Sequence, residues 1–294
     1  MILIVGCGFL GSYLLEHITS RKEETVFATV RNIEKAPRIS GAEYIECDVT
    51  KESDLVALAE RCKNETLTVF YLAACHNIDY VYENPEDARK TNIDALKNFL
   101  RLVPNINKLF FASTDCVYGE NDEDGGKFTE TAPLAPVNEY GKQKAEAEAT
   151  VTANGYTVLR LPFMLGPSLN SSPHFYDRIC TSLKNNESVE MIDGMFRSVL
   201  SYSQVAEIMF TLSQTDGDLP PVINICSDDS LSKYEMGCIL AQELNRPAEL
   251  IKKISEAQGK KFFKDRRAHS APMDNTLLKN LLDIKTLRWE DRKC

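Results

Sequence analysis

Short apolar segments alternate along the chain with longer segments in which apolar residues recur every three or four positions. The first kind is typical of β-strands and the second of α-helices. The predicted strands of the first half are Ile2–Val5, Thr25–Val30, Glu43–Cys47, Leu67–Ala73, Lys108–Ala112 and Thr157–Leu161. The predicted helices between them are Leu10–Thr19, Glu52–Arg61, Pro85–Leu102 and Tyr140–Thr152. Because several strands are apolar without alternation, we expect an α/β fold with a doubly wound parallel sheet, a Rossmann fold.

After Leu161 this regular alternation stops, and residues 162–173 are rich in Pro, Gly, Ser and Asn, as in loops. Further predicted elements are helices over Phe175–Asn185, Tyr202–Ser213, Lys233–Asn245 and Asn275–Leu282 and a strand over Val222–Cys226. We therefore predict a first domain over residues 1–165 and a smaller lobe over residues 166–294. The chain is expected to cross back to the first domain around residues 196–227.

Charge and composition exclude several classes of protein. The 294 residues include 34 Lys and Arg against 43 Asp and Glu, a net charge of −9, which disfavours nucleic-acid binding. No apolar run approaches the roughly 20 residues that span a membrane. The nine cysteines contain no C-x-x-C pair and lie mostly in apolar segments, and the four His form no cluster with them. We therefore expect reduced thiols, no metal site and a cytoplasmic location.

A glycine-rich turn follows the first predicted strand. Gly6-Cys7-Gly8-Phe9-Leu10-Gly11 has the form G-x-G-x-x-G and opens an amphipathic helix. In a dinucleotide site the first glycine makes a tight turn, the second admits a pyrophosphate, and the third allows close helix packing. The alternative is a turn that serves packing alone. We predict that this turn, including Phe9 and Leu10, binds a dinucleotide.

The ends of the second and third strands bear on which dinucleotide binds. An NAD site usually has Asp or Glu about 20 residues after the glycines, but here the strand ends in Arg31. An arginine can pair with a 2′-phosphate, so NADP(H) is favoured and NAD(H) is the alternative; Arg31 can also be an ordinary surface residue. Asp48 and Val49, after the third strand, are placed to approach the adenine, or Asp48 serves only to cap the next helix.

Three polar residues suggest acid–base chemistry. Tyr140 and Lys144 are four residues apart at a helix start and so share one face. Tyrosine has a pKa of about 10, so a nearby lysine ammonium would help it exchange protons at neutral pH. Thr114 ends a strand at the carboxyl edge of the sheet, where ligands of such folds bind. Together they predict a site for carbonyl–alcohol interconversion.

The order of these motifs resembles that of the extended short-chain dehydrogenase/reductases, the NAD-dependent epimerase/dehydratase family. The motifs are G-x-G-x-x-G, LAA at 72–74, Asn92, STDCVYG at 113–119, YGKQK at 140–144 and LRLPFMLGP at 159–167. The resemblance implies a catalytic set of Thr114, Tyr140, Lys144 and Asn92. It also implies that the cofactor contacts Leu72, Ala73, Ala74 and Pro162, besides Tyr140 and Lys144.

Within that superfamily, the chain looks most like the dTDP-4-dehydrorhamnose reductases, on its STD motif and the segment Arg267–Asp274. Two departures are Val5, where the extended family has a first glycine, and Ala268, where the reductases have proline. The resemblance implies that NAD(P)H reduces a 4-keto group of a nucleotide sugar. In the related 4,6-dehydratases the triad threonine is followed by an Asp-Glu pair, and Cys116 takes the place of that glutamate.

Two other functions remain open on the same residues. One is a nucleotide-sugar epimerase that retains NAD, and the other is a non-catalytic, NADP-binding regulatory subunit. The expected partners are a nucleotide-sugar substrate and, at most, a second copy in a homodimer. No nucleic acid and no membrane is expected.

Overall fold

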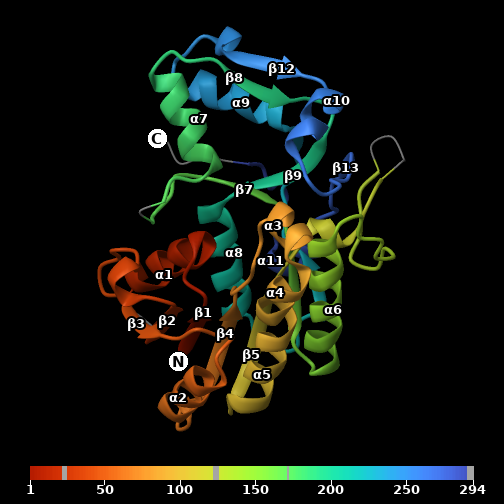
Figure 1. Ribbon diagram of the computed structural model, residues 1–294. Helices are drawn as coiled ribbons and strands as arrows, with labels where there is room; N and C mark the ends of the chain where they lie inside the picture. Colours follow the sequence, from red (N-terminus) through yellow and green to blue (C-terminus); the bar gives the residue numbers. More distant parts are fainter. Residues whose placement is uncertain (22–24, 122–125, 171, 290–294) are drawn as a thin grey trace.

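The computed structural model describes residues 1–21, 25–121, 126–170 and 172–289. Its main feature is a sheet of parallel strands in the order β10-β6-β5-β4-β1-β2-β3 (Figure 1). These strands are β1 (Ile2–Val5), β2 (Val26–Val30), β3 (Glu43–Glu46), β4 (Leu67–Tyr71), β5 (Ile106–Thr114), β6 (Thr157–Leu161) and β10 (Val222–Asn224). The order reverses between β1 and β4, where ligands of such sheets bind. The predicted doubly wound α/β fold is confirmed.

Helices cover both faces of this sheet, which explains why several of its strands are apolar without alternation. Ile2 and Ile4 of β1 pack toward one layer of helices, and Leu3 and Val5 pack toward the other. The first layer holds α1 (Phe9–Arg21), α8 (Tyr202–Gln214) and α11 (Thr276–Leu282). The second holds α2 (Glu52–Cys62), α5 (Ala95–Leu102) and α6 (Glu139–Ala153).

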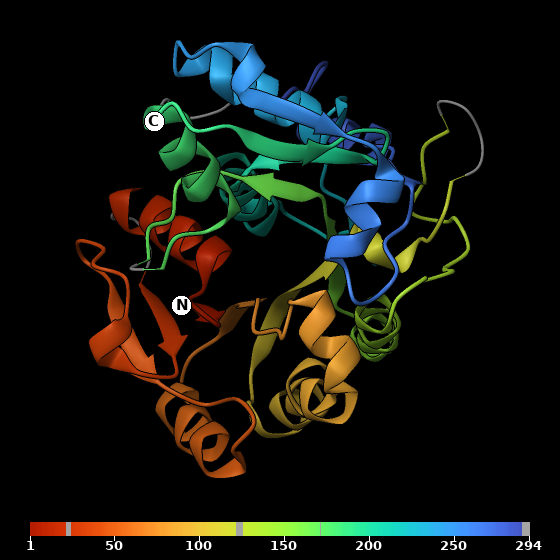
Figure 2. The same ribbon diagram turned by 45° about the horizontal axis from the view of Figure 1, so that its top comes forward.

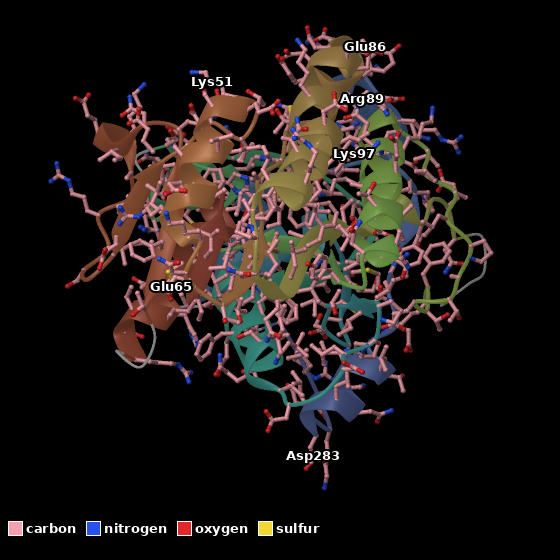
Figure 3. All side chains as sticks on the ribbon, turned by 90° about the horizontal axis from the view of Figure 1, so that it is seen from below. Lys51, Glu65, Glu86, Arg89, Lys97 and Asp283 are labelled. Carbon is pink, nitrogen blue, oxygen red and sulfur yellow. The ribbon has the colours of Figure 1, made fainter. Side chains whose placement is uncertain are left out.

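The helix predicted over Pro85–Leu102 is interrupted, which corrects the sequence analysis. After α3 (Ile78–Glu83) come α4 (Pro85–Arg89), a π-helical segment η2 (Lys90–Asp94) and then α5. A π segment inserts one residue into the helical repeat, which apolar spacing alone does not reveal. Arg89 on α4 and Lys97 on α5 are labelled in Figure 3. Both pair with Glu146, at 2.6 and 3.2 Å, and so join this helix to α6.

The C-terminal part adds a second layer of short elements above the large sheet (Figures 1 and 2). Its central strand β9 pairs with β7, β11 and β13, and β12 pairs with β8. The strands are β7 (Phe163–Leu165), β8 (Val189–Ile192), β9 (Phe196–Ser201), β11 (Ser230–Ser232), β12 (Ile251–Ile254) and β13 (Ser270–Ala271). The helices are α7 (Phe175–Lys184), α9 (Lys233–Glu243) and α10 (Glu256–Gly259). Short 3₁₀ turns are η1 (Ile33–Lys35), η3 (Asp115–Val117), η4 (Ala248–Leu250) and η5 (Lys260–Phe262).

Between β9 and β11 the chain returns to the large sheet. Helix α8 packs against α1, and β10 extends the sheet beside β6. The division of the chain at residue 165 stays a prediction. Among the described residues, every helix is too short or too polar to cross a membrane.

Candidate active site

The glycine turn after β1 is shaped by close backbone contacts. Gly6 has φ +97°, and a Cβ there would lie 2.7 Å from the Ala73 nitrogen at the end of β4. A Cβ on Gly11 would lie 2.5 Å from the Gly6 oxygen, so α1 packs directly on the turn. A Cβ on Gly8, by contrast, would meet no atom within 4 Å. The second glycine therefore borders open space, and the first and third enable packing.

The other residues predicted around this turn differ in exposure. Leu10 is buried in the core between α1 and α8, so its side chain serves packing. The half-buried Phe9 ring, at the start of α1, instead lies 4.3 Å from the ring of His174, the residue before α7, measured between centroids. Leu72 donates its N–H to the Val5 oxygen at 2.8 Å, which places the end of β4 beside the turn. Ala74, two residues after Leu72, is half-buried. Pro162, the residue after β6, is buried.

The ends of β2 and β3 carry the residues predicted to select the cofactor. Arg31 is exposed after β2, and its charge is one of the influences that lower the pKa of Asp48. The largest is the Thr50 hydroxyl, which donates to Asp48 Oδ1 at 2.7 Å; the Thr50 N–H adds a bond of 3.1 Å. This carboxylate therefore caps the turn before α2. Val49 is buried in the core, and only its backbone can face a ligand.

The predicted catalytic residues lie on β5 and α6. Thr114 ends β5, where its Oγ1 accepts the Cys116 N–H at 3.2 Å and donates to Asp115 Oδ1 at 3.1 Å. Tyr140 and Lys144 are in the first turns of α6 and are both buried. The Lys144 ammonium donates to the Ala112 oxygen on β5 at 2.5 Å. This bond helps to fix α6 against the strand that carries Thr114.

The surroundings of Tyr140 favour its protonated form. Burial is the largest cause that raises the pKa of the phenol, and coupling to the ionisable groups of Cys116 and Asp115 raises it further. Burial also lowers the pKa of Lys144 to about 7, against a smaller opposing effect of Glu148. The sequence analysis expects the lysine to ease proton loss from Tyr140. That expectation stays a prediction, since the raised pKa of the phenol follows first from its burial.

Asn92 joins two parts of this region. Its Oδ1 accepts the Cys75 N–H at 2.8 Å and its Nδ2 donates to the Cys75 oxygen at 3.1 Å. The same Nδ2 donates to Gln143 Oε1 on α6 at 3.0 Å. Asn92 therefore holds the segment after β4 next to the helix of Tyr140, and it lies in the π segment, a feature often found at functional sites.

Comparison with known proteins identifies the family. The model of the NAD dependent epimerase/dehydratase family matches residues 2–226. The chain belongs to this family. Its first strand and glycine turn, β5, and the first turns of α6 all lie within the matched part.

Three similar proteins illustrate the range of the NAD-dependent epimerase/dehydratase family. The chain is 26% identical to methionine adenosyltransferase 2 subunit beta of Xenopus tropicalis, over 64% of this chain and 58% of that subunit, less than two thirds of its length. The structure of MoeE5 in complex with UDP-glucuronic acid and NAD has a TM-score of 0.80 at 23% identity, over 98% and 94% of the two chains. A hypothetical dTDP-4-dehydrorhamnose reductase from Sulfolobus tokodaii has a TM-score of 0.78 at 20% identity, over 99% and 98%.

The structure also brings in residues that the sequence analysis did not assign to the site. Asp115, directly after Thr114, is buried, and burial raises the pKa of its carboxyl against the opposing charge of Arg197. Arg197 belongs to β9, and its Nε lies 3.5 Å from Asp115 Oδ2. This guanidinium also donates to the Phe196 oxygen at 2.7 Å. No local pattern marks Arg197, because its partner is far away in the sequence.

A second arginine from the C-terminal layer pairs with an acid of the first domain. Arg267 Nη2 lies 2.9 Å from Asp79 Oδ1 on α3. Arg267 also lines a cavity of about 540 Å³, together with Glu120, Glu256, Lys260, Arg266 and His269. The basic residues that the sequence shows around 260–267 are therefore interleaved with acids. Among the described residues, no group of His, Cys, Asp and Glu could hold a metal ion.

Proposed function

We propose that the chain is an NAD(P)H-dependent oxidoreductase that reduces a keto group, at C4, of a nucleotide sugar. The observation that carries the proposal is the placement of Thr114 at the end of β5 next to α6, which bears Tyr140 and Lys144 and is joined to β5 by the bond from Lys144 to Ala112. A reductase needs an acid that gives a proton to the oxygen of the new alcohol. An epimerase would use the same residues but retain its NAD, whereas the exposed Arg31 favours NADP(H), a cofactor that exchanges with solvent.

Each predicted residue then has a part in the reaction. When bound, the nicotinamide supplies the hydride that goes to the carbonyl carbon. The Tyr140 hydroxyl gives its proton to the carbonyl oxygen, and Thr114 donates a hydrogen bond to the same oxygen. Lys144 holds α6 against β5 and supplies positive charge as Tyr140 becomes a phenolate. Asn92 is a positioning residue that fixes the Cys75 segment.

For the cofactor we propose NADP(H) in preference to NAD(H). Arg31 is exposed at the end of β2, at the position where an NAD site has an acid, and its guanidinium suits a 2′-phosphate. The glycine turn and the Leu72–Ala74 segment would hold the dinucleotide, with Gly8 beside the pyrophosphate. Asp48 is kept in place by Thr50 and would border the adenosine side.

For the substrate, we propose a nucleotide sugar that lies between the catalytic residues and the C-terminal layer. MoeE5, which has the same fold, binds UDP-glucuronic acid. In this chain, Arg197 and Arg267 reach from the C-terminal layer toward Asp115 and Asp79. Guanidinium groups at that boundary suit the diphosphate of such a substrate.

The test is the oxidation of NADPH in the presence of a 4-keto nucleotide sugar. Wild-type protein should consume NADPH in proportion to the ketone reduced. Tyr140→Phe should lose roughly 10²–10⁴-fold in turnover and keep its cofactor affinity, because only the ionisable hydroxyl is removed. Tyr82→Phe, an exposed tyrosine on α3, is the matched control and should keep full activity. If the wild type instead interconverts two nucleotide hexoses without added cofactor, the proposal is wrong and the chain is an epimerase.

A second candidate function has one observation in its favour, the 26% identity to methionine adenosyltransferase 2 subunit beta. On that basis the chain would be a non-catalytic, NADP-binding partner of another enzyme. Pull-down with a methionine adenosyltransferase catalytic subunit tests it. Binding that persists in Tyr140→Phe, together with no turnover on any keto sugar, would favour this role.

A further inference from the structure

Lys233 is the first residue of α9, and its backbone is firmly placed. Ser232 caps the helix: its Oγ accepts the Glu235 N–H at 3.2 Å, and Glu235 Oε2 accepts the Ser232 N–H at 2.7 Å. This reciprocal pair is a capping box, which determines where the helix begins. The direction in which the Lys233 side chain leaves the helix is therefore determined by the fold.

The ammonium of Lys233 is surrounded by aromatic rings. It lies 5.8 Å from the ring centroid of Phe163, 5.3 Å from that of Phe175 and 5.4 Å from that of Phe263. These rings come from β7, α7 and the segment after η5. Aromatic faces attract a cation, and they also keep water away from it. The half-buried ammonium thus has less hydration than a surface lysine.

Its neighbours include two further cations, both of which have acidic partners. Arg197 pairs with Asp115 at 3.5 Å, and Arg267 pairs with Asp79 at 2.9 Å. Within the residues that the structure describes, no carboxylate or carbonyl oxygen binds the Lys233 ammonium. Burial and the charges of Arg267 and Arg197 lower the pKa of this lysine to about 8, with Asp79 acting in the opposite direction.

A cation with little water, two cationic neighbours and no anionic partner is unfavourable unless a ligand supplies the anion. Packing does not require it, because a methionine would fill the space between three phenylalanines equally well. We propose that Lys233 binds an anionic oxygen of the substrate, either of its diphosphate or of a carboxylate on its sugar. The proposal rests on the proposed function and adds a specificity-determining residue to it.

The test is isothermal titration calorimetry on the full chain saturated with NADPH. The ligands titrated into it are UDP, dTDP, UDP-glucose and UDP-glucuronic acid. Lys233→Met removes the charge and keeps the packing, and Lys233→Arg keeps the charge. Losing a hydrogen bond between charged groups should weaken binding by roughly 10-fold or more. Lys233→Arg should recover part of that affinity. The thermal midpoint of unliganded Lys233→Met should equal or exceed that of the wild type, because no carboxylate or carbonyl partner is lost and the repulsion by Arg197 and Arg267 is removed.

The ligands distinguish the two sources of the anion. If Lys233 binds the diphosphate, Lys233→Met weakens every probe that the wild type binds, and rising salt reduces the difference. If it binds a sugar carboxylate, only UDP-glucuronic acid loses affinity. Lys253→Met is the matched control, because that ammonium also lies over a ring, Tyr234 at 4.8 Å, but pairs with Asp193 at 2.7 Å.

Two negative results have different meanings. If wild type and Lys233→Met bind all probes equally, the assignment of Lys233 is overturned and the proposed function stands. If the wild type binds none of the four probes, the nucleotide-sugar function is overturned, and the role of Lys233 falls with it.

Discussion

The buried ion pair between Arg160 on β6 and Glu148 on α6 offers a direct test of what holds the catalytic helix in place. Both side chains are only 5% exposed. Glu148 accepts from Arg160 Nη2 at 2.8 Å and from the Ser113 hydroxyl at 2.5 Å, next to Thr114. Glu148→Gln keeps the shape of the side chain but leaves a buried guanidinium without its counter-charge.

The expected cost follows from that geometry. Removing one partner of a buried pair destabilises a protein by about 3–5 kcal/mol, a large part of a typical stability of about 5–15 kcal/mol. A chain of 294 residues has an unfolding entropy of about 0.6 kcal/mol/K. The midpoint of thermal unfolding should therefore fall by about 5–8 °C in Glu148→Gln.

Glu146, two residues earlier on the same helix, is the control. Its side chain is 40% exposed and pairs with Arg89 and Lys97 at the surface. Surface pairs are worth about 1 kcal/mol or less, so Glu146→Gln should shift the midpoint by less than about 2 °C. Circular dichroism of the unliganded proteins on heating gives both values. Equal shifts for the two variants would refute the reasoning, because burial would then have no effect.

Three further results are expected. Gly8→Ala should weaken cofactor binding in titrations and leave the midpoint of thermal unfolding unchanged. Gly11→Ala should weaken cofactor binding and also lower the thermal midpoint, because its Cβ would lie 2.5 Å from a backbone oxygen. Arg31→Ala should weaken NADPH binding roughly 10- to 100-fold and spare NADH; equal losses would argue against contact with a 2′-phosphate. Burial lowers the pKa of Lys144 in the folded chain to about 7. Above that pH the unfolded chain binds more protons than the folded chain, so the free energy of unfolding rises with pH. Thermal midpoints from about pH 7 to about pH 9 should rise relative to Lys144→Met, and parallel curves would contradict the assigned shift.

The large sheet was predictable because several of its strands, such as β1 and β4, are continuous apolar runs that stand out between periodic helices. The small strands of the C-terminal layer were not. Ser270–Ala271, for example, forms β13 only because β9 offers it an edge, and two residues carry no pattern of their own. The π segment was missed for a related reason, since one inserted residue changes helical spacing too little to be seen.

The candidate site divides in the same way. Thr114 and Tyr140 follow from local motifs and from the rule that ligands bind at the carboxyl edge of a parallel sheet. The raised pKa of Tyr140 could not be predicted, because it depends first on how deeply the phenol is buried and then on its distance from Cys116 and Asp115. Lys233 could not be placed either, since its three rings come from separate segments of the chain.

The π segment also limits how this helix can vary in length. An α-helix turns by about 100° for each residue, so deleting one residue between 90 and 94 would restore a regular repeat and rotate one end against the other. Either Asn92 would turn away from Cys75, or Leu96 and Phe99 would turn out of the core, where both are now fully buried. A shorter and more regular helix would therefore lose the hydrogen bonds by which Asn92 holds the Cys75 segment. In descendants of this chain, the length of the segment from Pro85 to Leu102 should be preserved more strictly than the identity of its exposed residues.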